Sequence, residues 1–263
     1  MTSDEESERA GMTAGEFSRD WLATHLAEER AKASLLGEVR EAIFGAQDGL
    51  VSTLAVVSTV AGASADRFPI LIAGIASGLA GVFSMAAGEY MSSKSQREIF
   101  EAQIVGEREE VQERPGEALA EMAYMFEEDG LPAKEAASVA GVIASHPEVL
   151  LKTMVEKELG LTGDHAEGSP FQGALIMGAS FGLGAAVPIV PYLLLPVHSG
   201  VIGSIAATGV VLFAIGVVKS RWTQRNWLRS GLEILLLAAF AGIAGFFFGN
   251  ILPGLLGVQA PAV

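Results

Sequence analysis

The chain has 263 residues, of which 50% are hydrophobic, and its mean hydropathy is +0.41. This composition excludes an ordinary soluble domain, because the apolar residues fall in long blocks instead of being spread evenly. The absence of cysteine excludes disulfides and thiolate metal sites. The net charge of −14 disfavours nucleic acid as a partner and favours cations.

The first 41 residues, 1–41, form a polar and acidic region that we place in the cytoplasm. Aromatic and leucine side chains recur at helical spacing over residues 13–40, with Glu, Arg and Lys between them. This pattern is typical of an amphipathic helix that lies on the inner leaflet and leads into a membrane span, and a loosely ordered tail is the alternative. The acidic start has no apolar core, so we expect the first span to direct insertion without a secretory signal.

Five segments have the roughly 20 mainly apolar residues that a membrane-crossing helix needs. They lie at about 42–63, 70–91, 171–193, 199–218 and 232–252. With the N-terminus in the cytoplasm, sixteen of the seventeen Lys and Arg residues lie on the cytoplasmic side and only Arg67 lies outside. We therefore predict an all-α polytopic protein of the lipid bilayer, with two transmembrane helices in 42–91, three in 171–252 and a short non-cytoplasmic tail at 253–263.

A polar block of residues 92–170 separates the second and third spans and is too long to be a simple connector. Proline and glycine positions divide it into helices at about 92–113, 116–129, 132–145 and 147–159. Apolar side chains recur on them at helical intervals, as Leu119, Met122 and Phe126 do. The sequence predicts a cytoplasmic helical insert with one apolar face per helix.

Asp48 is the one charged residue of the first predicted span, about 9 Å from its start at 1.5 Å per residue. Placing a charged side chain within a span costs about 2.5–3.5 kcal/mol of insertion free energy. Such a residue is usually functional and faces the bundle interior. Met85 lies at a similar depth in the second span, and Glu89 and Glu41 lie one and two turns nearer the cytoplasm. A carboxylate with a thioether suits Fe(II) better than Mg²⁺ or Ca²⁺. The alternative is that Asp48 hydrogen-bonds another span and Met85 only packs.

The insert carries seventeen acidic residues between Ser92 and Glu167. Three pairs share a helical face, namely Glu107 with Glu110, Glu117 with Glu121, and Met154 with Glu158. If these faces converge, they form a carboxylate cage with a thioether at its edge, able to hold more than one divalent ion. A solvated glutamate-rich surface is the alternative interpretation.

Several motifs of other protein classes do not occur in the sequence. The Glu-x-x-His pair of a ferritin-like di-iron bundle is absent, and so are a His-Glu-x-x-His sequence, a Walker loop and a Rossmann glycine pattern. We therefore expect neither an enzyme nor an ATP-driven pump, and no organic cofactor.

Two motifs resemble the vacuolar iron transporter family, REAIFGAQDGLVSTLAVVSTVAGA at residues 40–63 and SMAAGEYMSSKSQRE at 84–98. Together with the glutamate-rich insert, the likeness extends over about 37–254. The resemblance implies a homodimer of five-span subunits that exports Fe(II), and often Mn(II), from the cytosol in exchange for protons. It places translocation at Asp48 and Met85, with Glu89 in the same motif. It also makes the insert a metal-binding domain with the ligands Glu107, Glu110, Glu121, Met154 and Glu158.

The insert departs from the family pattern at one position. The second carboxylate pair of the family is spaced by three residues, but Ala118 stands three before Glu121 and the nearest glutamate is Glu117. Either Glu117 substitutes from one residue away or the cage has lost a ligand.

Other functions stay open at this point. The rivals are a transporter mainly of Mn(II) or another divalent ion, a membrane-anchored metal sensor that does not transport, and a structural scaffold. Transport requires a polar group within the spans, and Asp48 supplies one, whereas a sensor does not need it. We expect the host membrane to be a prokaryotic cell membrane rather than a vacuole.

Overall fold

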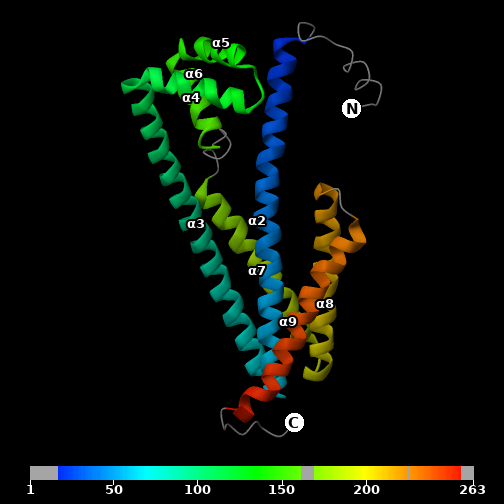
Figure 1. The fold of residues 1–263 in the computed structure, drawn as a ribbon. Helices are drawn as coiled ribbons and strands as arrows, with labels where there is room; N and C mark the ends of the chain where they lie inside the picture. The colour runs from blue at the N-terminus through cyan, green and yellow to red at the C-terminus, as the bar shows by residue number, and fades with distance from the viewer. Residues whose placement is uncertain (1–16, 161–168, 224–225, 256–263) are drawn as a thin grey trace. The chain divides into compact units, whose positions relative to one another are not determined.

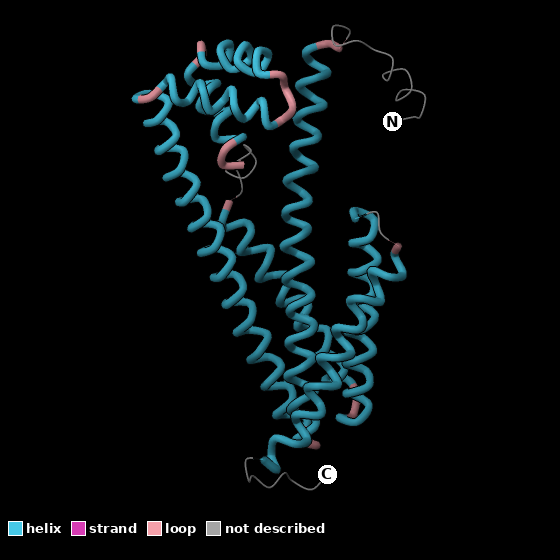
Figure 2. Tube along the Cα trace, in the orientation of Figure 1, coloured by secondary structure: helices cyan, strands magenta, loops and turns pink. Residues whose placement is uncertain are grey.

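The computed structural model describes residues 17–160, 169–223 and 226–255, apart from a number of side chains in the last two helices. All regular structure in this part of the chain is α-helical, as Figure 2 shows, so the all-α prediction is confirmed. The helices labelled in Figure 1 are α2 (Arg19–Ala63), α3 (Arg67–Glu113), α4 (Pro115–Glu128), α5 (Ala133–Ala144), α6 (Pro147–Lys157), α7 (Pro170–Leu194), α8 (Val197–Thr223) and α9 (Trp227–Leu255).

The chain forms two compact units. The insert unit comprises residues 1–38 and 106–168, and the membrane unit comprises residues 39–105 and 169–263. In the described part of the chain, α2, α3, α7 and α8 are long and apolar enough to cross a membrane. These four helices contain the first four predicted spans.

The predicted fifth span, 232–252, falls in α9, where many side chains lie outside the described residues. Most of the predicted tail at 253–263 lies outside them as well. Five crossings therefore stay a prediction.

The first two long helices are longer than a membrane crossing needs. α2 has 45 residues and runs without a break from Arg19 to Ala63, so the described part of the helix predicted over 13–40 and the first span form one continuous helix. The sequence contains no proline there, and Gly37 costs only about 1 kcal/mol in a helix interior, which is too little to end the helix. α3 has 47 residues and continues the second span to Glu113, just before Pro115, as predicted.

Within the membrane unit, α7 packs tightly against α2. A Cβ atom at Gly49 would lie 2.2 Å from the carbonyl oxygen of Phe181, and one at Gly184 would lie 2.3 Å from the carbonyl oxygen of Ala46. The two backbones are therefore in direct contact, and only glycine fits at these positions. On its other side α7 meets α3, where a Cβ at Gly178 would lie 3.0 Å from the Cβ of Ala86.

Two apolar clusters complete the described core of the membrane unit. Leu50 of α2 packs with Leu212 of α8 and Ile234 of α9. The second cluster joins α2, α3 and α7 through the buried side chains of Val57, Ile70, Ile189 and Tyr192. The helices that carry the predicted translocation residues are thus fixed by packing on their inner sides.

In the insert unit, α4, α5 and α6 form a small bundle whose bounds agree with the predicted helices. Its buried side chains come from all three helices and include Ala118, Met122, Ala136, Ala140, Leu150 and Met154. Gly130 and Gly160 follow α4 and α6 with φ of 104° and 65°, a conformation that glycine adopts without strain. Lys157 donates a hydrogen bond to Asp129 and lies 4.8 Å from the ring centre of Phe126, which ties α6 to the end of α4.

Candidate metal centre

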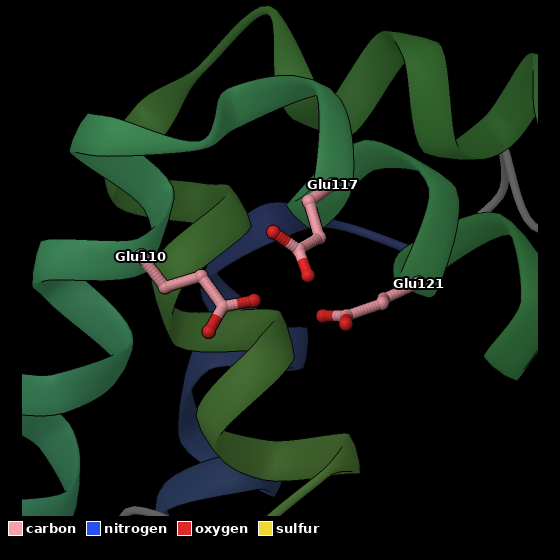
Figure 3. Close-up of side chains that lie close together, drawn as sticks. All are labelled: Glu110, Glu117 and Glu121. Carbon is pink, nitrogen blue, oxygen red and sulfur yellow. The ribbon is translucent and has the colours of Figure 1, made fainter.

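Three carboxylates lie together where α3 meets α4. Glu110 is in the last turn of α3, and Glu117 and Glu121 are in the first two turns of α4. One oxygen from each lies within 4.8 Å of the others, and Figure 3 shows the three side chains pointing toward a common space. The turn between the helices is only one residue long, which brings the end of α3 onto the start of α4. A group of carboxylate oxygens is a donor set for divalent cations.

The electrostatics of this cluster disfavour its fully ionised form without a cation. Burial raises the pKa of Glu121, and the hydrogen bond and the charge of Glu110 raise it further. Burial likewise raises the pKa of Glu107, with added repulsion from Glu158 and Glu110. Glu107 is only 9% exposed, and its buried Oε2 has no hydrogen-bond partner among the described residues. A divalent ion would relieve this repulsion, so the arrangement fits a metal as its ligand.

Glu117, and not position 118, contributes to this cluster. Ala118 is fully buried and faces the core of the bundle, whereas Glu117 is exposed and its carboxylate joins those of Glu110 and Glu121. A glutamate at position 118 would point into the apolar core. The structure therefore favours Glu117 as the substituting ligand over a cage that has lost one, and its binding of metal stays a prediction.

The two predicted ligands of the last insert helix, Met154 and Glu158, lie in different environments. Met154 is fully buried in the bundle, which is the environment that core packing alone would give it. Glu158 is exposed at the end of α6, and its charge acts on Glu107 and Glu121. Glu158 thus lies at the rim of the carboxylate cluster, while a role of Met154 as ligand stays a prediction.

Asp48 is exposed in the single chain, contrary to the expectation that it faces the bundle interior. Gly45 and Gly49 occupy the side of α2 that contacts α7, and Asp48 is turned about 100° from Gly49. The Asp48 carboxylate makes no hydrogen bond with any described residue, whereas the backbone carbonyl of Asp48 accepts one from Ser52 Oγ at 2.5 Å. The alternative in which Asp48 hydrogen-bonds another span therefore finds no support in the described residues.

The other predicted translocation residues are half-buried. Met85 and Glu89 lie on α3, one turn apart, and Ser93 Oγ donates a hydrogen bond of 2.6 Å to Glu89 Oε1. Glu41 of α2 lies beside the first turn of α7, where a Cβ at Gly173 would be 3.1 Å from Glu41 Oε2. Its carboxylate thus lies at the positive end of the α7 dipole.

Sequence reasoning missed two glycine features near these residues. Gly45 and Gly49 are four residues apart, the spacing of small residues at close helix contacts, and this signal was present in the sequence. Gly173 leaves room for Glu41 across two helices far apart in the chain, and no local pattern marks such a contact.

Comparison with known proteins gives the family. Residues 39–250 match the model of the VIT family. The chain belongs to this family. It is 30% identical to vacuolar iron transporter 1 of Arabidopsis thaliana over 237 residues, which are 90% of this chain and 94% of that protein. It is 31% identical to vacuolar iron transporter 1 of Eucalyptus grandis over 209 residues, 79% of this chain and 84% of that one.

A more distant VIT family relative is the vacuolar iron transporter of Toxoplasma gondii, 26% identical over 242 residues, 85% of this chain and 77% of that protein. The predicted resemblance is therefore confirmed, and its span of about 37–254 agrees with the match. Because these relatives are named as transporters, the chain is a member of a transporter family and not an enzyme, as predicted. None of the relatives named here supports the prediction of a prokaryotic host membrane.

Proposed function

We propose that this VIT family protein exports Fe(II) from the cytosol across its membrane in exchange for protons. The observation that carries the proposal is Asp48, an ionisable residue in an apolar helix long enough to cross a membrane. The match to a family whose members are named iron transporters adds the substrate. The donor set does not discriminate Fe(II) from Mn(II), so Mn(II) is proposed as a second substrate.

The carboxylate cluster is proposed to collect the ion. Its three members, Glu110, Glu117 and Glu121, are joined in this proposal by Glu107 and Glu158, whose charges interact with theirs, and by Met154 as a further ligand. Several negative charges in one place raise the local concentration of a cation. Because most of these side chains keep contact with water, a bound ion can be released again.

The membrane step is proposed to run through α2 and α3. The ion passes Glu41 and Glu89 and is then coordinated by the Asp48 carboxylate and the Met85 thioether. A carboxylate holds either a metal ion or a proton at one oxygen, so a single aspartate can exchange one for the other. This exchange links metal export to the entry of protons.

We further propose that the protein works as a homodimer. An aspartate exposed to lipid would cost about 2.5–3.5 kcal/mol, which is avoided if another protein surface covers it. α3 also exposes a row of large apolar side chains in the single chain, namely Phe68, Ile72, Ile75, Leu79 and Phe83. In the proposed dimer a second copy covers both the apolar row and Asp48, and a two-fold pair is the commonest arrangement of identical subunits.

The proposal is tested by Fe(II) and Mn(II) flux into proteoliposomes under an imposed pH gradient. Three proteins are compared: the unmodified chain, Asp48→Asn, and Asp66→Asn as a matched control in the loop between α2 and α3. Gradient-dependent flux that is lost only in Asp48→Asn supports the antiporter. Metal binding without flux in the unmodified protein would instead identify a metal sensor.

A further inference from the structure

Arg114 is the one residue that separates α3 from α4, and its backbone is held by both helices. Its N–H donates to the Glu110 carbonyl at 2.8 Å, and its own carbonyl accepts from the N–H of Glu117 at 3.0 Å. The backbone of Arg114, with φ of −130° and ψ of 54°, therefore turns the chain directly beside the carboxylate cluster.

The side chain of Arg114 returns to the same cluster. Its Nη2 lies 3.0 Å from Glu110 Oε2 and its Nη1 lies 2.8 Å from Glu117 Oε2, so one guanidinium bridges two of the three carboxylates. The third member, Glu121, lies close enough for its charge to act on Arg114. A positive charge is thus held at two of the three carboxylates that a divalent ion would bind.

We propose that Arg114 is a built-in counter-cation of the carboxylate cage, which competes with the divalent ion and so sets the metal concentration at which the cage fills. The inference rests on the proposed function, because it takes the cage to be where the cytosolic ion is collected. Before metal binds, the guanidinium neutralises part of the charge of Glu110 and Glu117. When metal binds, it gives up these two ion pairs.

The competition follows from charge and from the limited number of oxygen lone pairs. A guanidinium beside the cage repels a doubly charged ion, and at separations of a few ångström this repulsion is substantial even in water. Arg114 also uses one oxygen each of Glu110 and Glu117, which leaves fewer donors for the metal. The Arg114 side chain is 55% exposed, and ion pairs of exposed groups are weak enough to be given up.

If Arg114 instead supported metal binding, replacing it would change the metal affinity in the opposite direction. Hydrogen bonds to metal-ligating carboxylates often orient the ligands, and removing such a partner weakens metal binding. If Arg114 acted in this way, replacing it would lower the affinity of the cage. The sign of the change in affinity therefore separates the two roles.

The experiment measures Mn(II) binding to the full-length protein in detergent by titration calorimetry. All variants carry Asp48→Asn, so that the heat reports the cage and not the proposed membrane site. We expect Arg114→Gln to bind Mn(II) about tenfold more tightly, the size expected for removing a neighbouring positive charge under partial screening. Arg114→Lys keeps the charge and is expected to show a smaller gain.

The matched control is Arg97→Gln. Arg97 also pairs with a glutamate one turn away on α3, with its Nε 3.0 Å from Glu101 Oε1, but it lies about 20 Å along the helix from Glu110. We expect its affinity to be unchanged. An Arg114→Gln protein that binds Mn(II) no better than Arg97→Gln, or binds it less well, would overturn the inference and leave the transport proposal standing. Absence of Mn(II) binding in every variant would overturn the cage and the inference together.

A second measurement does not depend on the folding of a variant. A dicarbonyl reagent that modifies arginine is applied to the unmodified protein with and without Mn(II), and the modified peptides are quantified by mass spectrometry. Because metal is proposed to release the guanidinium, Arg114 should react faster with Mn(II) present while Arg97 does not change. Equal or slower reaction of Arg114 with Mn(II) contradicts the inference.

Discussion

The carboxylate cluster of the insert unit and the polar residues of the membrane unit are built in different ways. In the insert unit, three carboxylates from consecutive helical turns meet within one chain. In the membrane unit, Asp48 is exposed in the single chain and its carboxylate makes no hydrogen bond with a described residue. The first arrangement lies within one chain, whereas the second, in the proposed mechanism, is covered by the surface of a second copy. In that mechanism, capture of the ion is a task for one chain and translocation is a task for an assembly.

The largest expected effects come from two mutations, one of which changes only metal transport and the other first of all metal binding. Asp48→Asn should abolish gradient-driven flux while leaving Mn(II) binding by the insert unit unchanged. Glu121→Gln should weaken that binding by roughly tenfold, because one charge is lost from the cage, and should raise the metal concentration needed for half-maximal flux. Flux assays and calorimetry on both variants check this. If either variant lost both gradient-driven flux and Mn(II) binding, the separation of metal capture from translocation would be contradicted.

The next effect concerns the tight contact between α2 and α7. Gly49→Ala puts a Cβ only 2.2 Å from the carbonyl oxygen of Phe181, so we expect a loss of about 1–3 kcal/mol or more in unfolding free energy. Gly37→Ala is the matched control on the same helix, since nothing lies within 4 Å of its added Cβ. It should gain about 0.5–1 kcal/mol. Denaturant unfolding in detergent measures both, and equal stabilities would exclude the backbone contact.

The pH dependence of stability concerns the cluster in the insert unit. Burial raises the pKa of Glu107 above its ordinary value of 4.5, so the folded protein binds this proton more tightly than the unfolded chain does. The resulting stability is present at acid pH and is lost as the pH rises from 4.5 through the raised pKa. We expect the metal-free melting temperature to fall over this range, and saturating Mn(II) to oppose the fall.

Glu107→Gln tests the cause of this pH dependence. The amide has no charge to bury, so the fall in melting temperature with pH should become shallower. Glu101→Gln, which changes an exposed glutamate of the same helix, is the control. If the two variants have the same pH profile, the burial of Glu107 is not the cause.

The smallest expected effect concerns Glu41. Gly173→Ala would place a Cβ 3.1 Å from Glu41 Oε2, so the carboxylate must move by a few tenths of an ångström. We expect a few-fold loss of flux with no loss of stability, because alanine is also the better helix former. Gly141→Ala in α5, where the added Cβ meets nothing within 4 Å, is the control. A flux equal to that of the control would show that the position of Glu41 is not critical.

Local signals in the sequence predicted the helices of the insert unit well. Pro115 and Pro147 lie at helix starts, and Gly130 follows the end of α4, because the conformations of these residues are restricted or special by themselves. The spacing of Glu117 and Glu121 placed them on one face for the same reason. These features depend on neighbours within four residues.

Features that depend on contacts between distant segments were not predicted. Helical periodicity gives the side of α2 on which Asp48 lies, but not what covers that side. The contact of Gly49 with Phe181 requires knowing that α2 and α7 are neighbours. Arg114 was overlooked although it stands four residues after Glu110 and three before Glu117, a spacing that favours ion pairs on a continuous helix.

The glycine-lined contact between α2 and α7 has a consequence for motion. A transporter must open its site to each side of the membrane in turn, and this usually happens by rocking of rigid groups of helices. Because the backbones of the two helices touch at Gly49 and Gly184, no side chains lie between them that could slide or repack. In the proposed transport cycle we therefore expect α2 and α7 to move as one body, and the opening to occur on the side of α2 that carries Asp48.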